Sequence, residues 1–295
     1  MINRRLFLGA LGAGVSLGAT RGVAMPGRAA LARRLSAIEA ERGGRLGVAI
    51  FDTGSGLRAD LRGDERFPLC STFKLLAVAA VLARAETGRE DMRRRVVFTR
   101  DDVVEYSPVT KERIGGKGMT LSELCDAAMT LSDNTAGNLL LAAIGGPDGL
   151  TQYARTLGDK ESRLDRIEPF LNEAVPGDPR DTTTPLGMLA GIETLLMKDA
   201  LAKPSRETLT AWLLATRTNA GRLVAGMPTG CRVGSRTGTG ERGTTNEVGA
   251  IWAPGGRAPI LFAIYLTGAP GPGAQRNATL AEIGRAVAAH LNLVD

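Results

Sequence analysis

Apolar and polar positions follow two periods along the chain, and their order predicts its elements. Residues 31–44 repeat apolar positions at helical spacing and end on two glycines, whereas residues 45–67 read as two strands around a turn at 52–54. Residues 71–88 are apolar on nearly every face until Arg84, which indicates a helix surrounded by protein. Three later strands and a closing amphipathic helix are predicted over residues 231–240, 244–254, 259–268 and 278–294.

The middle of the chain, to about residue 228, has a mostly helical pattern. Thr120 and Glu123 form a capping-box pattern that starts one helix. Residues 163–185 differ, because four prolines and many charges stand there without a sustained period. We expect an ordered loop, since loops of this length in a compact domain are usually functional or disordered. Other helices are predicted over residues 134–146, 146–158, 185–201 and 205–219.

Strands from both ends of the chain with a helical block between them predict an α/β two-lobe (α+β) fold. One antiparallel sheet is flanked by the N- and C-terminal helices, an all-helical lobe stands beside it, and the cleft between the lobes is the natural place for a site. We assign residues 1–24 to an export signal and 25–295 to a single domain. Its sheet lobe takes about 30–68 and 229–295, and its helical lobe about 69–228.

The first residues have the pattern of a targeting segment. Arg4 and Arg5 precede an apolar, glycine-rich run and a small-residue cleavage site, like a twin-arginine leader, and the run is too short to span a bilayer. An exported, periplasmic or secreted protein is therefore expected. Cleavage would remove Arg4, Arg5 and Arg21 and no acid, which lowers the formal net charge from +6 to +3. With few aromatics and no basic stripe, no nucleic-acid partner is expected.

The cysteines and the histidine exclude several chemistries. Cys70, Cys125 and Cys231 form no C-x-x-C, so neither a disulfide framework nor a zinc site is indicated, and we expect no metal and no cofactor. His290 is the only histidine and stands on the apolar-rich terminal helix. A structural role suits it better than a Ser-His-Asp triad.

The chain's Ser-x-x-Lys, Ser71 and Lys74, opens the apolar helix at 71–88. Such a pair occurs by chance about once in a chain this long, so alone it means little. However, this helix is too apolar to expose a lysine. We therefore expect the Lys74 ammonium to be buried and partnered, with a lowered pKa that lets the amine accept a proton from the serine.

Three further stretches hold candidate chemistry. Residues 132–134 (Ser-Asp-Asn) follow a predicted helix and alone read as a polar turn, and Arg236-Thr237-Gly238 lies on a strand where glycines permit close approach. Glu168 and Asn172 stand in the proline-rich loop, one helical turn apart. A carboxylate and an amide at that spacing can hold one water between them, poised to attack an ester made by Ser71.

Together and in this order, these four motifs resemble a class A serine β-lactamase, one of the penicillin-recognising serine enzymes. The resemblance runs from about residue 30 to the C-terminus. "YSPVTK", "AAMTLSDNTAGNLLL" and "NEVGAIWAP" add matches between the motifs. It implies the same two-lobe fold and action on a small β-lactam. We expect a monomer, because one cleft suffices and no pattern indicates an interface, and we expect no stable membrane anchor after cleavage because the apolar run is short.

The resemblance also implies roles for these residues. Ser71 is the nucleophile that opens the lactam to an acyl-enzyme, and Lys74, or Glu168 through water, takes its proton. Ser132 passes a proton to the leaving nitrogen, and Glu168 with Asn172 activates the water that hydrolyses the ester.

The remaining implied roles concern substrate binding and the loop. The substrate-binding residues are Tyr106, Asn134, Arg222, Arg236, Thr237, Gly238 and Thr239, with the N–H groups of Ser71 and Thr239 as the oxyanion hole. Arg166 and Asp181 match the ion pair that holds the family's omega loop.

Several positions depart from the family pattern. Most members have Lys where Arg236 stands; carbenicillin-hydrolysing members also carry Arg there, which suggests penicillins with an acidic side chain as substrates. Many members have Arg at Thr245, and Arg222 matches the alternative donor of other members. The family's disulfides are not expected, because the partner positions of Cys70 and Cys125 hold Gly240 and Val78.

Other functions fit this pattern less well. A D,D-peptidase, or another penicillin-binding protein, would share Ser71 and Lys74 but would not need Glu168 and Asn172, so these two residues favour the lactamase. A penicillin sensor acylates and stays acylated, and is usually tied to a membrane segment and a signalling module. A non-catalytic periplasmic binding protein would not require a buried lysine.

Overall fold

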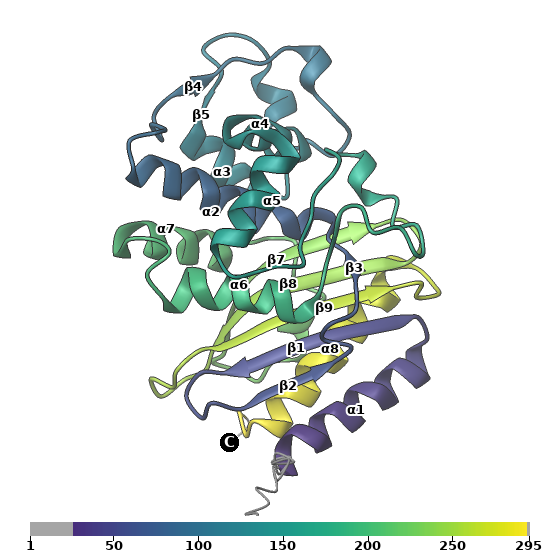
Figure 1. The fold of residues 1–295 in the computed structure, drawn as a ribbon. Coiled ribbons are helices and arrows are strands. Elements are labelled where there is room, and N and C mark those ends of the chain that lie inside the picture. Colours follow the sequence, from purple (N-terminus) through teal and green to yellow (C-terminus); the bar gives the residue numbers. More distant parts are fainter. Residues whose placement is uncertain (1–25, 294–295) are drawn as a thin grey trace, which may run out of the picture.

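The structure, a computed structural model, describes residues 26–293, and the predicted leader at residues 1–24 lies outside them. Its main sheet has five strands in the order β2-β1-β9-β8-β7, and every neighbouring pair is antiparallel (Figure 1). The predicted meeting of strands from both chain ends is confirmed. The strands are β1 (Arg45–Asp52), β2 (Arg58–Leu61), β7 (Arg232–Gly240), β8 (Thr244–Trp252) and β9 (Ile260–Thr267).

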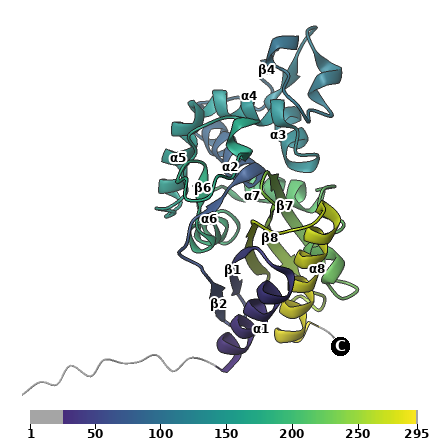
Figure 2. The same cartoon turned by 90° about the vertical axis from the view of Figure 1, so that its right-hand side faces the viewer.

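Helices cover both faces of this sheet, which explains why its central strands are apolar at almost every position. In β1, Leu46, Val48 and Ile50 belong to one apolar cluster and Ala49 to the other, as the two-residue period of a strand requires. The cluster that contains Leu46, Val48 and Ile50 includes side chains of α1 and α8. The opposite face of the sheet packs against α6 and α7 (Figure 2). These helices are α1 (Pro26–Arg42), α6 (Pro185–Met197), α7 (Lys203–Leu214) and α8 (Gly273–His290).

The helical lobe is built around α2, whose residues from Phe73 to Leu82 are all buried. The prediction of a helix surrounded by protein is thus confirmed, because α3, α4, α5 and α7 all pack against it. The capping box is present as well, with reciprocal bonds between Thr120 and Glu123 at the start of α3. The helices are α2 (Phe73–Glu86), α3 (Leu121–Thr130), α4 (Asn134–Ile144) and α5 (Gly146–Thr156).

Two parts of the predicted helical block differ. The segment between α2 and α3 contains only short elements, since its many charges leave no apolar stripe to hold a long helix: β4 (Arg95–Val96), β5 (Met119–Thr120), η2 (Arg100–Asp102) and η3 (Thr110–Arg113). α7 ends at Leu214, before the predicted end at 219. The following 3-10 turn η5 (Leu223–Gly226) packs against α8, because buried Leu223 joins the apolar cluster on that face of the sheet.

The proline-rich stretch is the predicted ordered loop. We call residues 163–181 the omega loop, and its only regular element is the 3-10 turn η4 (Phe170–Asn172). It ends at β6 (Thr182–Thr183), which pairs with β3 (Phe67–Pro68), just before Ser71. This pairing places the loop against the turn that carries Ser71. Within residues 26–293, no helix has the length and apolar character to cross a membrane.

Candidate active site

Ser71 and Lys74 meet where a tight turn becomes a helix. Ser71 lies in the 3-10 turn η1 (Cys70–Thr72), which leads directly into α2, and Lys74 is in the first turn of α2. The Lys74 Nζ donates a hydrogen bond of 2.9 Å to Ser71 Oγ. Lys74 is completely buried and Ser71 is 8% exposed. The expected burial and pairing of this lysine are therefore present.

Lys74 also connects the helical lobe to the omega loop. Its Nζ donates to the Ser132 carbonyl at 2.9 Å and to Asn134 Oδ1 at 2.6 Å, and lies 3.0 Å from Glu168 Oε1. Burial lowers the pKa of the Lys74 ammonium, the Glu168 carboxylate opposes this effect, and the charge of Arg236 adds to it. The lysine thus gives up its proton more readily than a solvated one.

Glu168 completes this contact set from the omega loop. Ser71 Oγ donates to Glu168 Oε1 at 3.0 Å, and the side-chain amide of Asn172 donates to Glu168 Oε2. Asn172 Oδ1 is buried and has no hydrogen-bond partner among the described residues. The hydroxyl, the amine, the carboxylate and the amide are therefore joined by hydrogen bonds in one group.

Two residues of α4 that the sequence reasoning missed support this group. Asn138 holds the backbone of Glu168 at both ends, donating to its carbonyl at 3.0 Å and accepting from its N–H at 2.9 Å. A Cβ on Gly137 would come within 2.7 Å of Lys74 Cε. The sequence signal for both was a Gly-Asn pair directly before the apolar remainder of α4.

Ser132 and Asn134 reach the cleft through an unusual turn between α3 and α4. Ser132 has a φ of +61°, a left-handed conformation that redirects the chain between the helices. The Asp133 carboxylate caps α4 at the Ala136 N–H, and Asn134 Nδ2 donates to the Glu105 carbonyl at 2.9 Å. These bonds fix both ends of the turn, so Ser132 and Asn134 are held at the cleft.

Arg236 lies behind the cleft. Its guanidinium is fully buried and donates to the carbonyls of Ala128 and Met129, at the end of α3, and to the hydroxyls of Thr218 and Thr237. Burial and the neighbouring charge of Arg222 lower the pKa of Arg236 to about 9, so it stays protonated at neutral pH. Arg236 joins β7 to α3 and orients Thr237, whose hydroxyl lines the cleft.

Arg222 supplies a cation that lines the cleft. Its guanidinium donates to Thr239 Oγ1 at 2.7 Å and to the carbonyls of Gly238 and Asn246 at 2.9 and 2.6 Å. Gly238 is packed against the turn of Ser71, since a Cβ there would meet the Leu69 carbonyl at 3.1 Å. The β7 backbone and the Ser71 turn are thereby in direct contact.

The cleft has a volume of about 450 Å³. Of the residues predicted to react or to bind substrate, four lie behind the wall of the cleft and do not line it: Lys74, Glu168, Arg236 and Gly238. Its lining residues are Ser71, Tyr106, Ser132, Asn134, Asn172, Arg217, Thr218, Arg222, Thr237 and Thr239. Arg217 and Thr218 were missed, because they follow α7 in a stretch that the sequence pattern continued as helix.

The remaining predicted pair is also in contact. Arg166 Nε lies 2.6 Å from Asp181 Oδ2, and the same carboxylate accepts the backbone N–H groups of Asp165 and Arg166. Asp181 is only 1% exposed. The two ends of the omega loop are thus tied together.

The described residues contain no group of three or more His, Cys, Asp or Glu that could hold a metal. His290, at the end of α8, lines a separate cavity with Arg34, Arg42 and Glu282. It therefore takes no part in the contact set around Ser71.

Comparison with known proteins places this arrangement in a family. The profile of the Beta-lactamase enzyme family matches residues 30–291. Beta-lactamase CTX-M-8 of Citrobacter amalonaticus is 47% identical over 235 residues, 80% of each chain, and beta-lactamase AST-1 of Nocardia asteroides is 47% identical over 254 residues, 86% of this chain and 81% of that one. The solved structure of an ancestral class A beta-lactamase is 55% identical, with a TM-score of 0.86, over 88% of this chain and 99% of that one. This chain belongs to the class A β-lactamases.

The departures from the family pattern now have structural positions in this class A β-lactamase. All three cysteines are free, and a Cβ on Gly240 would come within 2.6 Å of Cys70 Sγ, so the position without a cysteine faces the one that has it. Arg276, on α8, donates to Thr245 Oγ1 at 3.3 Å. The Arg276 guanidinium thus lies beside the strand position, here Thr245, at which many family members have an arginine.

Proposed function

We propose that this enzyme hydrolyses the amide bond of the β-lactam ring in penicillins and cephalosporins, giving resistance to these antibiotics, through an ester on Ser71. The observation that carries this proposal is the buried contact of Ser71 Oγ with both Lys74 Nζ and Glu168 Oε1, at 2.9 and 3.0 Å. A serine with two proton acceptors, one of them on the omega loop, is equipped both to form an ester and to have it hydrolysed.

In the first step, Ser71 Oγ bonds to the lactam carbonyl carbon and the ring C–N bond breaks. The hydroxyl proton goes to Lys74, whose Nζ lies 2.9 Å from Ser71 Oγ, or to Glu168, whose Oε1 accepts directly from that hydroxyl at 3.0 Å. Ser132 Oγ, 3.4 Å from Lys74 Nζ, is placed to relay a proton to the leaving nitrogen. The backbone N–H groups of Ser71 and Thr239 bind the developing oxyanion, an effect worth about 3 to 4 kcal/mol per donor in other enzymes.

In the second step, a water held by Glu168 and Asn172 attacks the ester. The unpartnered Asn172 Oδ1 supports this assignment, because a buried acceptor is satisfied by a water O–H. As the water oxygen bonds to the ester carbon, Glu168 takes one proton of that water, and this proton passes to Ser71 Oγ as the ester C–O bond breaks and the open-ring acid leaves with the other proton. The Arg166–Asp181 pair positions Glu168 by holding the loop.

The substrate is oriented by the residues that line the other walls. Thr237, Thr239 and Arg222 bind its carboxylate, Asn134 binds the side-chain amide, and Tyr106, 58% exposed, borders the entrance. Arg236 acts on the carboxylate site through Thr237, which gives little support to a direct contact between Arg236 and an acidic substrate side chain.

We also propose that the enzyme is exported through the twin-arginine-like leader at residues 1–24 and acts as a monomer in the periplasm or outside the cell. The sequence pattern of Arg4 and Arg5 before an apolar run supports the export route. A fusion of this leader to a reporter would lose export when both arginines become lysine.

Counting turnovers tests the proposed activity. The purified mature protein is mixed with a large excess of benzylpenicillin, with Ser71→Ala as the control, and ring openings per protein molecule are counted. We expect many openings per molecule in the parent protein and none in the control. A single opening with a stable adduct on Ser71 would instead identify a penicillin-binding peptidase or a sensor.

A further inference from the structure

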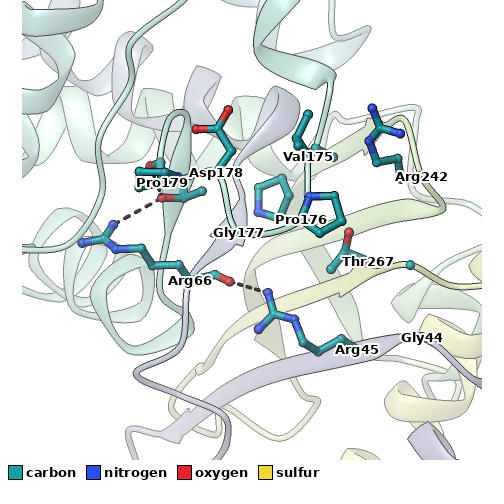
Figure 3. Close-up of a pocket in the computed structure, with 14 residues that line it drawn as sticks. Gly44, Arg45, Arg66, Val175, Pro176, Gly177, Asp178, Pro179, Arg242 and Thr267 are labelled. Atoms are coloured by element: carbon teal, nitrogen blue, oxygen red, sulfur yellow. Dashed lines mark hydrogen bonds between the residues drawn. The ribbon is translucent and has the colours of Figure 1, made fainter.

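A second cavity lies between the omega loop and the end of the sheet where β1 begins and β9 ends. Its volume is about 510 Å³, comparable to the cleft, and none of its lining residues lines the cleft. Figure 3 shows the loop segment from Val175 to Pro179 over one side of it and Arg45, Arg66 and Thr267 on the other. A cavity of this size accepts a small organic molecule.

The wall of this cavity is mostly apolar, but three arginines stand around it. Two of them are neutralised by neighbours, because Arg45 pairs with Glu65 at 3.0 Å and Arg66 with Glu161 at 2.7 Å. Arg242, in the turn between β7 and β8, is exposed, and its guanidinium has no hydrogen bond or ion pair among the described residues.

No acid among the described residues forms an ion pair with the Arg242 guanidinium. The lining residue Asp178 is already paired with Arg180, at 2.7 Å. Glu241 precedes Arg242 but does not line the cavity. One unmatched positive charge beside an apolar wall is complementary to a single negative charge on an apolar body.

We propose that this cavity binds amphipathic organic anions, namely alkyl or aryl groups that carry one carboxylate or sulfonate. The apolar body packs against Pro176 and the Thr267 methyl, and the anion pairs with Arg242. This site goes beyond the proposed hydrolysis and requires no step of it.

Binding there stabilises the omega loop in the conformation described above. The part of the omega loop that lines the cavity begins at Ala174, two residues after Asn172. The Asn172 carbonyl accepts a 2.9 Å hydrogen bond from the N–H of Glu241, the residue before Arg242. A ligand that touches both the loop and this turn binds best when they are together, so it shifts the loop toward that state.

The probe for the test is 8-anilinonaphthalene-1-sulfonate, titrated by fluorescence into the mature protein. We expect saturable binding of one molecule per chain. Charge reversal in Arg242→Glu should weaken it roughly twofold to fivefold, the scale of exposed charge pairs. Val175→Trp, which fills the cavity, should abolish it. The matched control is Arg217→Glu, which reverses an exposed arginine of the cleft and should leave probe binding unchanged.

Hydrogen exchange gives a second readout that does not depend on fluorescence. We expect the probe to slow exchange at residues 174–182 in the parent protein and not in Arg242→Glu, with variants compared only after their circular dichroism and melting match the parent. Three outcomes overturn the proposal. The first is that the parent protein shows no saturable binding. The second is that Arg217→Glu loses binding while Arg242→Glu keeps it, and the third is that Val175→Trp binds the probe as the parent does. Each can occur whether or not penicillin is hydrolysed.

Discussion

Replacing Asn138 tests how the omega loop is positioned, because this side chain holds Glu168 at both backbone ends. The substitution Asn138→Leu keeps nearly the same shape and removes both hydrogen bonds, of 2.9 and 3.0 Å. Glu168 is 1% exposed, so its N–H and carbonyl lose partners that water cannot readily replace. Asn138 itself is half-buried.

Each lost hydrogen bond costs about 1 kcal/mol, which gives about 2 kcal/mol in total. This value is at the low end for an unsatisfied buried group because Asn138 is partly solvated. If all of it falls on the placement of Glu168, hydrolysis of the ester slows about 30-fold, since about 1.4 kcal/mol is a factor of ten. Formation of the ester should change less if Lys74 is the base, because its contacts to Ser71 and Ser132 do not involve Asn138.

Stopped-flow mixing with benzylpenicillin and rapid-quench mass spectrometry measure the two steps separately, and urea unfolding measures the stability. Asn138→Asp is the comparison variant. It keeps the acceptor for the Glu168 N–H, but its other oxygen replaces the donor and faces the Glu168 carbonyl, so its effect should be at least half that of Asn138→Leu. An unchanged rate of ester hydrolysis together with unchanged stability in Asn138→Leu would refute the reasoning.

Three further predictions concern the reacting groups. Glu168→Ala should form the acyl-enzyme and stall there, seen as a persistent mass adduct of benzylpenicillin; a rapidly cleared adduct would contradict its role. Ser71→Ala should lose all covalent labelling by penicillins, and labelling of another residue would disprove the nucleophile assignment. Arg236 lowers the pKa of Lys74. Arg236→Ala should therefore raise the pKa of Lys74 and leave less of its amine neutral at a given pH. If Lys74 is the base, the acidic limb of the acylation pH profile should then move to higher pH. Arg236→Lys keeps the charge and should not move the limb, and an unmoved limb in both variants would favour Glu168 as the base.

The sequence alone determined the layers of this fold. Strands such as residues 259–268 are apolar at nearly every position because both faces are covered, and the helix at 71–88 is apolar all round for the same reason. Local signals also sufficed for Thr120 and Glu123, whose capping box involves only neighbouring residues. Local signals did not predict the short elements between α2 and α3 or the end of α7 at Leu214, because no apolar period distinguishes helix from loop in these stretches.

The order of motifs also identified the reacting residues, because the chemistry needs those residue types: a serine, a proton acceptor and a carboxylate with an amide. The order of motifs could not give the distances between these side chains, because Ser71 and Glu168 are 97 residues apart and meet only through packing of the omega loop. Packing likewise decided that Arg236 lies behind the cleft while Arg222 lines it, that Asn138 holds Glu168, and that a second cavity exists. Burial and charge balance at these places are sums over neighbours from several elements, and no local pattern of the chain contains them.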